Sequence, residues 1–161
     1  VIKMTTIQSD RLYMRNLIAS DLKDLIPMLK SEKVMQYTSF KRSLEDDEIA
    51  VHFNKWLNDP EVWTCLDHSE HYLGWFMLKS RAPHCYELGF MLAENQWGNG
   101  YASEASKALI DYAYKYMKVE RVEARVRIEN IHSIRTIEKL GFIEMNRDQE
   151  LINYEKKLKE E

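Results

Sequence analysis

The sequence predicts an α+β fold built on a mixed, mostly antiparallel sheet of about six or seven strands. Two observations carry this prediction. Short turns separate three consecutive strand-like segments, which is typical of an antiparallel meander: residues 61–67, 72–79 and 85–93. A helical segment then leads to a further strand at residues 121–128, and a crossover of that length allows the strands on either side of it to run parallel.

Length, composition and charge bound the class of protein. The 161 residues suit one domain, which we predict to span residues 1–161. The chain is 45% hydrophobic and 30% charged, as expected of a soluble globular protein. A net charge of −3 argues against general nucleic-acid binding, and no apolar run is long enough to span a membrane. The start of the chain lacks the apolar region of a signal peptide.

The two cysteines, Cys65 and Cys85, both lie in apolar, strand-like runs. One disulfide between them is an open alternative, but two reduced core thiols in a cytoplasmic protein are the favoured interpretation. No cation stands at a clear spacing to activate either thiol, so neither is expected to act as a nucleophile.

The first part of the chain predicts one strand and two helices. Residues 11–17 alternate in polarity and suit a strand, after which Ser20 or Asp21 can cap a helix. Residues 33–42 have no clear period and suit a loop with a short helical turn. A second helix begins near Ser43, and its acidic first turn suits the positive end of the helix dipole. Attraction of a cationic substrate is the alternative reading of these acids.

The polar turn before residue 72 raises the question of a metal site. Its candidate ligands are Asp67, His68, Glu70 and His71. Their spacing matches no familiar ligand pattern and no second cluster accompanies them, so we interpret the segment as a polar turn and predict no metal.

The stretch from residue 85 to residue 118 predicts an anion site. It combines a buried strand, a turn with Gly98 and Gly100, and an amphipathic helix from Ala102. A glycine turn that opens directly into a helix leaves backbone N–H groups pointing outward at the positive end of the helix dipole, which suits a phosphate. The alternative is that the glycines only permit a tight turn between strand and helix.

The last part of the chain predicts a strand, a short helix and a final strand. Residues 121–128 alternate apolar and charged side chains, which indicates one buried and one wet face. Residues 130–133 lead into a helix that ends near Gly141. Residues 151–158 suit a last strand at the edge of the sheet.

Three blocks of sequence, in this order, resemble the GNAT superfamily of N-acetyltransferases, and most of all its RimJ/RimL-type ribosomal-protein N-terminal acetyltransferases. The blocks are residues 11–17 with Asp21, residues 87–93 with 97–102, and residues 121–126 with 130–133 and 138–142. The resemblance covers nearly the whole chain. It implies the GNAT fold, with helices on both faces of the sheet and with strands four and five parallel and splayed apart around the pantetheine arm of acetyl-CoA.

The resemblance also implies a set of cofactor-binding residues. The family's loop pattern begins with Gln or Arg, has Gly three positions later and ends with Gly or Ala two positions after that. Gly100 and Ala102 match the last two positions, whereas Trp97 stands where the pattern has Gln or Arg. Backbone N–H groups of the loop would hold the pyrophosphate. Backbone groups near Met91 and Ala93 would pair with the cofactor amides, and an N–H around Leu92 would stabilise the oxyanion. The full predicted set is Met91, Leu92, Ala93, Trp97, Gly98, Asn99, Gly100, Tyr101, Ala102, Ser103, Asn130 and Ser133.

Acetyl transfer from a thioester to an amine needs a neutral amine, a donor for the developing oxyanion and a proton for the leaving thiolate. Glu87 is the candidate base, acting through a water, because burial in an apolar strand raises the pKa of a carboxyl group toward neutrality. The alternative is a structural carboxylate satisfied by backbone or by an arginine. His84 is a further candidate base, although a turn histidine is the commoner outcome there.

The general acid that the resemblance implies is absent. Many members of the family place a tyrosine in the closing helix, and that position holds Ile137 here. Ser133 or solvent is predicted to protonate the thiolate instead, with Tyr86 and Tyr154 as weaker candidates.

The predicted function is transfer of an acetyl group from acetyl-CoA to a primary amine, directly within a ternary complex. The acceptor is a peptide N-terminal amine or a small amine such as a polyamine, amino sugar or amino acid. The alternative is a noncatalytic acyl-CoA-binding or regulatory module. Nucleic acids and membranes are not expected as partners, and a homodimer is left open.

Overall fold

The computed structural model describes residues 5–159, so the ends of the predicted domain at residues 1–4 and 160–161 lie outside the described part. The strands are β1 (Thr6–Gln8), β2 (Leu12–Asn16), β3 (Val62–Asp67), β4 (Tyr72–Ala82), β5 (Cys85–Leu92), β6 (Arg121–Arg127), β7 (Ile143–Arg147) and β8 (Leu151–Lys157). The α-helices are α1 (Leu22–Leu29), α2 (Glu32–Met35), α3 (Asp46–Leu57), α4 (Tyr101–Met117) and α5 (Ile131–Lys139), with single 3-10 turns η1 (Ala19–Asp21) and η2 (Glu94–Gln96).

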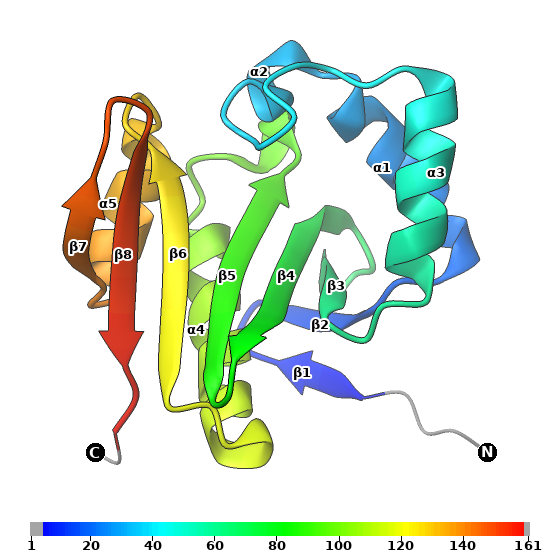
Figure 1. The fold of residues 1–161 in the computed structure, drawn as a ribbon. Coiled ribbons are helices and arrows are strands. Elements are labelled where there is room, and N and C mark those ends of the chain that lie inside the picture. Colours follow the sequence, from blue (N-terminus) through cyan, green and yellow to red (C-terminus); the bar gives the residue numbers. More distant parts are fainter. Residues whose placement is uncertain (1–4, 160–161) are drawn as a thin grey trace.

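One sheet of eight strands organises the described residues, in the order β1-β2-β3-β4-β5-β6-β8-β7 (Figure 1). Neighbouring strands are antiparallel except β5 and β6, which are parallel. The predicted meander is therefore β3-β4-β5, and α4 is the crossover that makes the parallel pair possible. Within residues 5–159, no helix is both long and apolar enough to cross a membrane.

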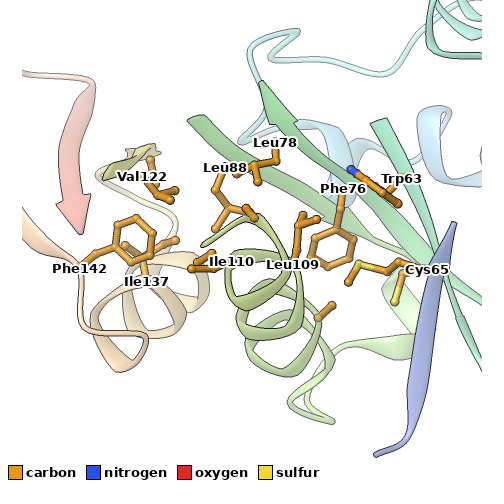
Figure 2. Close-up of a cluster of buried hydrophobic side chains, with 14 of the residues drawn as sticks. Trp63, Cys65, Phe76, Leu78, Leu88, Leu109, Ile110, Val122, Ile137 and Phe142 are labelled. Atoms are coloured by element: carbon orange, nitrogen blue, oxygen red, sulfur yellow. The ribbon is translucent and has the colours of Figure 1, made fainter. Parts of the chain in front are cut away.

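The main hydrophobic core lies between the sheet and the helices α4 and α5 (Figure 2). Leu88 of β5 and Val122 of β6 point to this side and meet Leu109 of α4 and Ile137 of α5, all of them almost fully buried. Burial of each such aliphatic side chain stabilises the fold by roughly 1.5–3 kcal/mol. Alternation along β6 explains its apolar positions, since Val122, Ala124 and Val126 all belong to this core.

A second core lies on the opposite side of the sheet, under α1, α2 and α3. Trp56 of α3 packs on Trp75 of β4 with ring centroids 5.1 Å apart, and Met91 of β5 joins the same cluster. Among the described residues, the strand residues buried in this cluster come from β3, β4 and β5 but not from β6, β7 or β8. Figure 1 shows α1–α3 gathered beside β3 to β5. On this side, the face of β6 is thus left without helical cover.

Asp21 joins three elements on the α1 side of the sheet. Its carboxylate forms a two-pronged ion pair with Arg15 of β2, at 2.8 and 3.0 Å. It also accepts hydrogen bonds from the hydroxyl group of Thr64 in β3 and from the main-chain N–H of Ile18, both at 2.9 Å. The side chain is buried, at 4% exposure. Asp21 occupies the N-cap position of α1, but its side chain makes no cap hydrogen bond there and instead ties β2, β3 and the start of α1 together.

The predicted strand number was too low, because two strands carry little sequence signal. β1 has only three residues, which is too short to show a period. β7 has only five residues, and its alternate apolar residues, Ile143 and Met145, are exposed, so no buried face marks it as a strand. β7 takes the edge position, and β8 lies between β6 and β7. The prediction that residues 151–158 form an edge strand is therefore wrong, although the strand itself is present.

Candidate active site

The sheet parts at its parallel pair. β5 and β6 pair only from Cys85 opposite Arg121 to Glu87 opposite Glu123, yet β5 continues to Leu92 and β6 to Arg127. Along these continuations β5 stays paired with β4, and β6 with β8. Each strand therefore keeps one hydrogen-bonded side and turns its other side to a gap. The predicted splay is present, and Figure 1 shows the two arrows diverging.

The main-chain groups that face this gap belong to Phe90 and Leu92. The Ala93 N–H donates to the carbonyl oxygen of Leu73 at 3.0 Å, and the Ala93 carbonyl accepts from Gln96 at 2.9 Å. Hydrogen bonds alternate in direction along an antiparallel strand, so Met91 also points to β4, whereas Phe90 and Leu92 point away from it. The expectation that Met91 and Ala93 offer backbone groups to the cofactor amides therefore shifts by one residue.

The glycine turn presents free donors at the start of α4. Gly98 and Gly100 have φ values of 82° and 78°, a left-handed conformation that side chains disfavour. Gly100 is the N-cap of α4, and the first hydrogen bond of the helix runs from the Glu104 N–H to the Gly100 carbonyl at 3.1 Å. Among the described residues, the N–H groups of positions 101–103 have no main-chain acceptor. A Cβ atom at Gly98 would meet nothing within 4 Å, so the turn has room for a phosphate.

Trp97 holds this turn against the end of β5. Its indole Nε1–H donates to the carbonyl oxygen of Leu92 at 3.0 Å, and the side chain stays 43% exposed. The side-chain amide of Asn99 donates to the carbonyl of Gln96 at 3.1 Å. Trp97, which replaces the Gln or Arg of the family pattern, thus has a structural role, because it connects the anion turn to the strand that borders the gap.

Arg11 is a neighbour of the anion turn that sequence reasoning did not assign to it. Its guanidinium lies 4.7 Å from the ring centroid of Tyr101, and its Nη2 would lie 3.5 Å from a Cβ atom placed on Gly100. Arg11 Nε also pairs with Glu104 at 2.7 Å. The two residues are 93 positions apart, so no local pattern could reveal this contact.

Glu104 holds the Arg11 side chain in position. Burial acts to raise its pKa, but hydrogen bonds from the Ser9 hydroxyl group and from Arg11 outweigh this and hold the pKa below its ordinary value. Glu104 therefore stays ionised near neutral pH and fixes the Arg11 cation beside the N-terminus of α4.

Asn130 and Ser133 lie at the start of α5. The Asn130 side-chain oxygen accepts a hydrogen bond from the Ser133 N–H at 3.2 Å and so caps the helix. Because α4 follows β5 and α5 follows β6, and these strands are parallel, both helices begin at the same end of the sheet (Figure 1). The fold thus brings the Asn130–Ser133 segment to the same end of the gap as the glycine turn.

Glu87 lies at the point where the gap closes, on the face away from α4. Its side chain is 9% exposed. Arg81 Nε lies 3.2 Å from Glu87 Oε1, and Arg125 Nε lies 3.2 Å from the same oxygen. Arg125 Nη2 also donates to Glu87 Oε2 at 3.4 Å. The predicted base is therefore buried among two cations, and the Arg125 side chain reaches across from β6 to β5.

The weaker catalytic candidates lie away from the gap. His84 has a φ value of 62° in the β4–β5 turn, and its Nδ1 lies 3.0 Å from the carbonyl oxygen of Lys118. The Tyr154 hydroxyl group donates to Glu138 at 3.3 Å, and burial raises the Tyr154 pKa. Ile137 is a core residue at 1% exposure. The position that often holds a tyrosine acid thus contributes packing here.

Neither cysteine is suited to nucleophilic catalysis, and the polar turn is not a metal centre. Cys65 and Cys85 are both free and buried. Burial raises the Cys65 pKa to about 12 and raises that of Cys85 as well, so both thiols stay protonated. Among the described residues, no group of three or more His, Cys, Asp or Glu side chains could hold a metal ion.

A sheet that parts at its parallel pair, beside a helix start that presents free N–H groups, is an arrangement that can accommodate a long, phosphate-bearing ligand. The family model described as "Acetyltransferase (GNAT) domain" matches residues 11–143. The chain is also 31% identical over 137 residues to the uncharacterized N-acetyltransferase YnaD of Bacillus subtilis strain 168, covering 84% of this chain and 81% of the relative. The chain therefore belongs to the GNAT family and is an N-acetyltransferase.

Solved structures share this fold. A GNAT-family acetyltransferase from Bacillus anthracis superposes with a TM-score of 0.87 at 22% identity, covering 95% of this chain and 98% of that one. A spermidine N-acetyltransferase from Vibrio cholerae, solved with CoA and spermine, gives a TM-score of 0.79 at 20% identity, covering 91% of this chain and 95% of that one. At these identities the likeness establishes the GNAT fold.

Proposed function

We propose that this acetyltransferase moves the acetyl group of acetyl-CoA directly to a primary amine within a ternary complex. The observation that carries the proposal is the gap between β5 and β6, which opens beside the free N–H groups at the start of α4. Direct transfer is favoured because both thiols are buried and protonated, which removes the nucleophile that an acetyl-cysteine route would need. These unpaired thiols also suit a cytoplasmic location.

The residues around the gap fit acetyl-CoA. Backbone N–H groups of residues 98–103 would hold the pyrophosphate, with Arg11 as a nearby cation. Backbone groups of Phe90 would pair with a pantetheine amide, because the Leu92 carbonyl already accepts from Trp97. Asn130 and Ser133 would border the other side of the gap. Bound acetyl-CoA supplies an activated acyl group with a thiolate leaving group.

The chain's own residues would then manage charge and protons. The Leu92 N–H is the donor for the oxygen that becomes negatively charged. Glu87 takes the proton of the amine through a water, and Ser133 protonates the thiolate. The acceptor is a peptide N-terminal amine, as the RimJ/RimL resemblance suggests, or a small amine.

Replacing Glu87 with glutamine is expected to lower kcat by about 100-fold, a usual loss when a general base is removed. The loss should be greatest at low pH, where fewer acceptor amines are neutral without help, and the Kd for CoA should not change. The measurement is a pH profile of kcat and KM for the variant and the wild type. If Glu87 only orients Arg81 and Arg125, the variant keeps the wild-type pH profile of kcat, and its KM rises instead.

Replacing Ser133 with alanine is expected to lower kcat by about ten-fold while leaving the Kd for CoA unchanged, because loss of a general acid slows departure of the thiolate. Thr136→Ala, which removes a hydroxyl group from the same helix, is the matched control and should retain its kcat. Equal rates for Ser133→Ala and the wild type would assign the proton to solvent.

The proposed reaction itself is tested by thiol release from acetyl-CoA over a panel of peptides and amines, with mass spectrometry of the products. Release that depends on an amine, with an acetylated product, supports the proposal. Tight binding of CoA without thiol release for any amine would instead support a noncatalytic acyl-CoA-binding module.

A further inference from the structure

The acceptor must reach the gap from the face that α4 and α5 do not cover. The anion turn and the starts of α4 and α5 occupy the other face, together with the main core. On the open face, β6 presents its alternate side chains, among them Arg125 and Arg127, and α1–α3 do not cover this strand. The charges along this face therefore decide which amines can approach.

Ion pairs line this opening. Where the gap closes, Arg81 and Arg125 flank the carboxylate of Glu87, and Glu123, the register partner of Glu87 on β6, lies near Arg121. Toward the open end, Arg127 Nη1 lies 3.8 Å from Glu150 Oε2, and Lys41 Nζ lies 3.5 Å from the same oxygen. Lys41 comes from the loop between α2 and α3, and Glu150 from the turn between β7 and β8. Glu87 and Glu150 are thus each shared by two cations.

Arg127 is short of acceptors. Its side chain is only 14% exposed, and its guanidinium group carries five N–H donors. At 3.8 Å the contact with Glu150 is beyond hydrogen-bonding distance, and Glu150 is itself 62% exposed. Among residues 5–159, the Arg127 side chain donates no hydrogen bond to another side chain or to backbone. None of its nitrogen atoms is a buried atom without a partner, so these donors reach solvent and are open to an anion that binds from there.

We propose that the acceptor amine also carries a carboxylate, and that Arg127, with Arg125 beside it on β6, binds this carboxylate. The proposal rests on the N-acetyltransferase function above and names the substrate class of that site. Side chains two residues apart on a strand share a face, so one anion can contact both guanidinium groups. Glu150 stands near Arg127 in the free protein and would give way to the substrate. A polyamine offers no anion to these two guanidinium groups and is therefore disfavoured.

The test compares amines that differ only in the carboxylate, with thiol release from acetyl-CoA as the measurement. Phenylalanine, phenylalaninamide and phenethylamine form one matched set, and spermidine is included. A peptide that begins with aspartate and its asparagine counterpart distinguish a free amino acid from an acidic peptide as the source of the carboxylate. In the matched set that the enzyme uses better, we expect kcat/KM for the substrate with the carboxylate to exceed kcat/KM for its neutral counterpart by about ten-fold or more. A charge-assisted hydrogen bond would give a difference of this size.

Variants then locate the effect. Arg127→Gln should bring the ratio of carboxylate to neutral substrate close to one, mainly through KM, and Arg125→Gln, at a half-exposed position, should lower it in part. Arg147→Gln removes an arginine from the edge strand β7, where Arg147 pairs with Glu144, and should keep the full ratio. Glu150→Gln should lower KM for the carboxylate substrate, because it removes the group that competes for Arg127.

Failure of the acetyltransferase proposal and failure of the carboxylate site would give different results. No thiol release with any amine would contradict the enzymatic proposal and not this inference alone. Release that is equal for carboxylate and neutral partners, or fastest with spermidine, would overturn the carboxylate site while leaving the acetyltransferase intact. A ratio that survives Arg127→Gln and Arg125→Gln in folded protein would overturn the assignment to these two arginines.

Discussion

Replacing Gly100 with aspartate is expected to raise the Kd for acetyl-CoA by on the order of 100-fold, because the new carboxylate stands beside the bound pyrophosphate. Two like charges about 4 Å apart near a protein surface repel by a few kcal/mol, and each 1.4 kcal/mol is a factor of about ten in Kd. The fold should survive, since aspartate is a good N-cap and tolerates a positive φ better than most residues. The measurement is calorimetric titration of CoA.

Gly100→Asn is the matched control for this charge. Asparagine has nearly the same shape as aspartate and accepts the same left-handed conformation, so it reproduces any steric or backbone effect without the charge. We expect its Kd to rise far less than that of the aspartate variant. Equal Kd values for the two variants would show that the turn does not hold the pyrophosphate through its backbone N–H groups.

Replacing Asp21 with asparagine is expected to lower the free energy of unfolding by about 3 kcal/mol at neutral pH, because it leaves the Arg15 guanidinium without its counter-charge in a buried site. The Asp21 carboxylate accepts from Arg15, Thr64 and Ile18, and an amide can satisfy only part of this set. The measurement is chemical denaturation. Asp10→Asn, at an exposed position, is the control and should change stability by less than about 0.5 kcal/mol.

The effect of Asp21 should also depend on pH in a defined direction. Burial acts to raise its pKa, but hydrogen bonds from Arg15, Ile18 and Thr64 prevail, so the folded-state pKa lies below its ordinary value. A carboxyl group with a lowered folded pKa adds stability that is complete above the unfolded pKa of about 3.9 and is lost as the pH falls through the folded value. The stability difference between wild type and Asp21→Asn should therefore shrink below about pH 4. A constant difference down to pH 2 would contradict this account.

Local patterns explain why much of the site could be predicted. Two glycines before an amphipathic helix indicate the anion turn wherever they occur, because the free N–H groups belong to the helix itself. The strict alternation of residues 121–128 indicates a half-buried strand, and a crossover helix then makes a parallel pair possible. The Asn130–Ser133 cap is also a local feature, since the side chain and the N–H that it caps are three residues apart.

Contacts between distant segments account for what sequence reasoning missed. Arg11 reaches the anion turn only because β2 lies near the start of α4 in the folded chain. The register of the β4–β5–β6 strands sets which backbone groups face the gap, and it moves that role from Ala93 to Phe90 and Leu92. The edge strand β7 buries no side chain and is held by its pairing with β8.

The sequence by itself determined the family, the order of most elements and the turn that can bind phosphate, because these depend on periodicity and on turn residues that act within a few positions. Only the tertiary structure decided which charged side chains surround the site. Glu87, which the sequence marks as a carboxylate in an apolar strand, lies between Arg81 and Arg125, and Arg127 lies largely buried nearby without hydrogen bonds. Charged side chains on separate strands interact through space, so these ion pairs form only when the fold brings β4, β5 and β6 side by side.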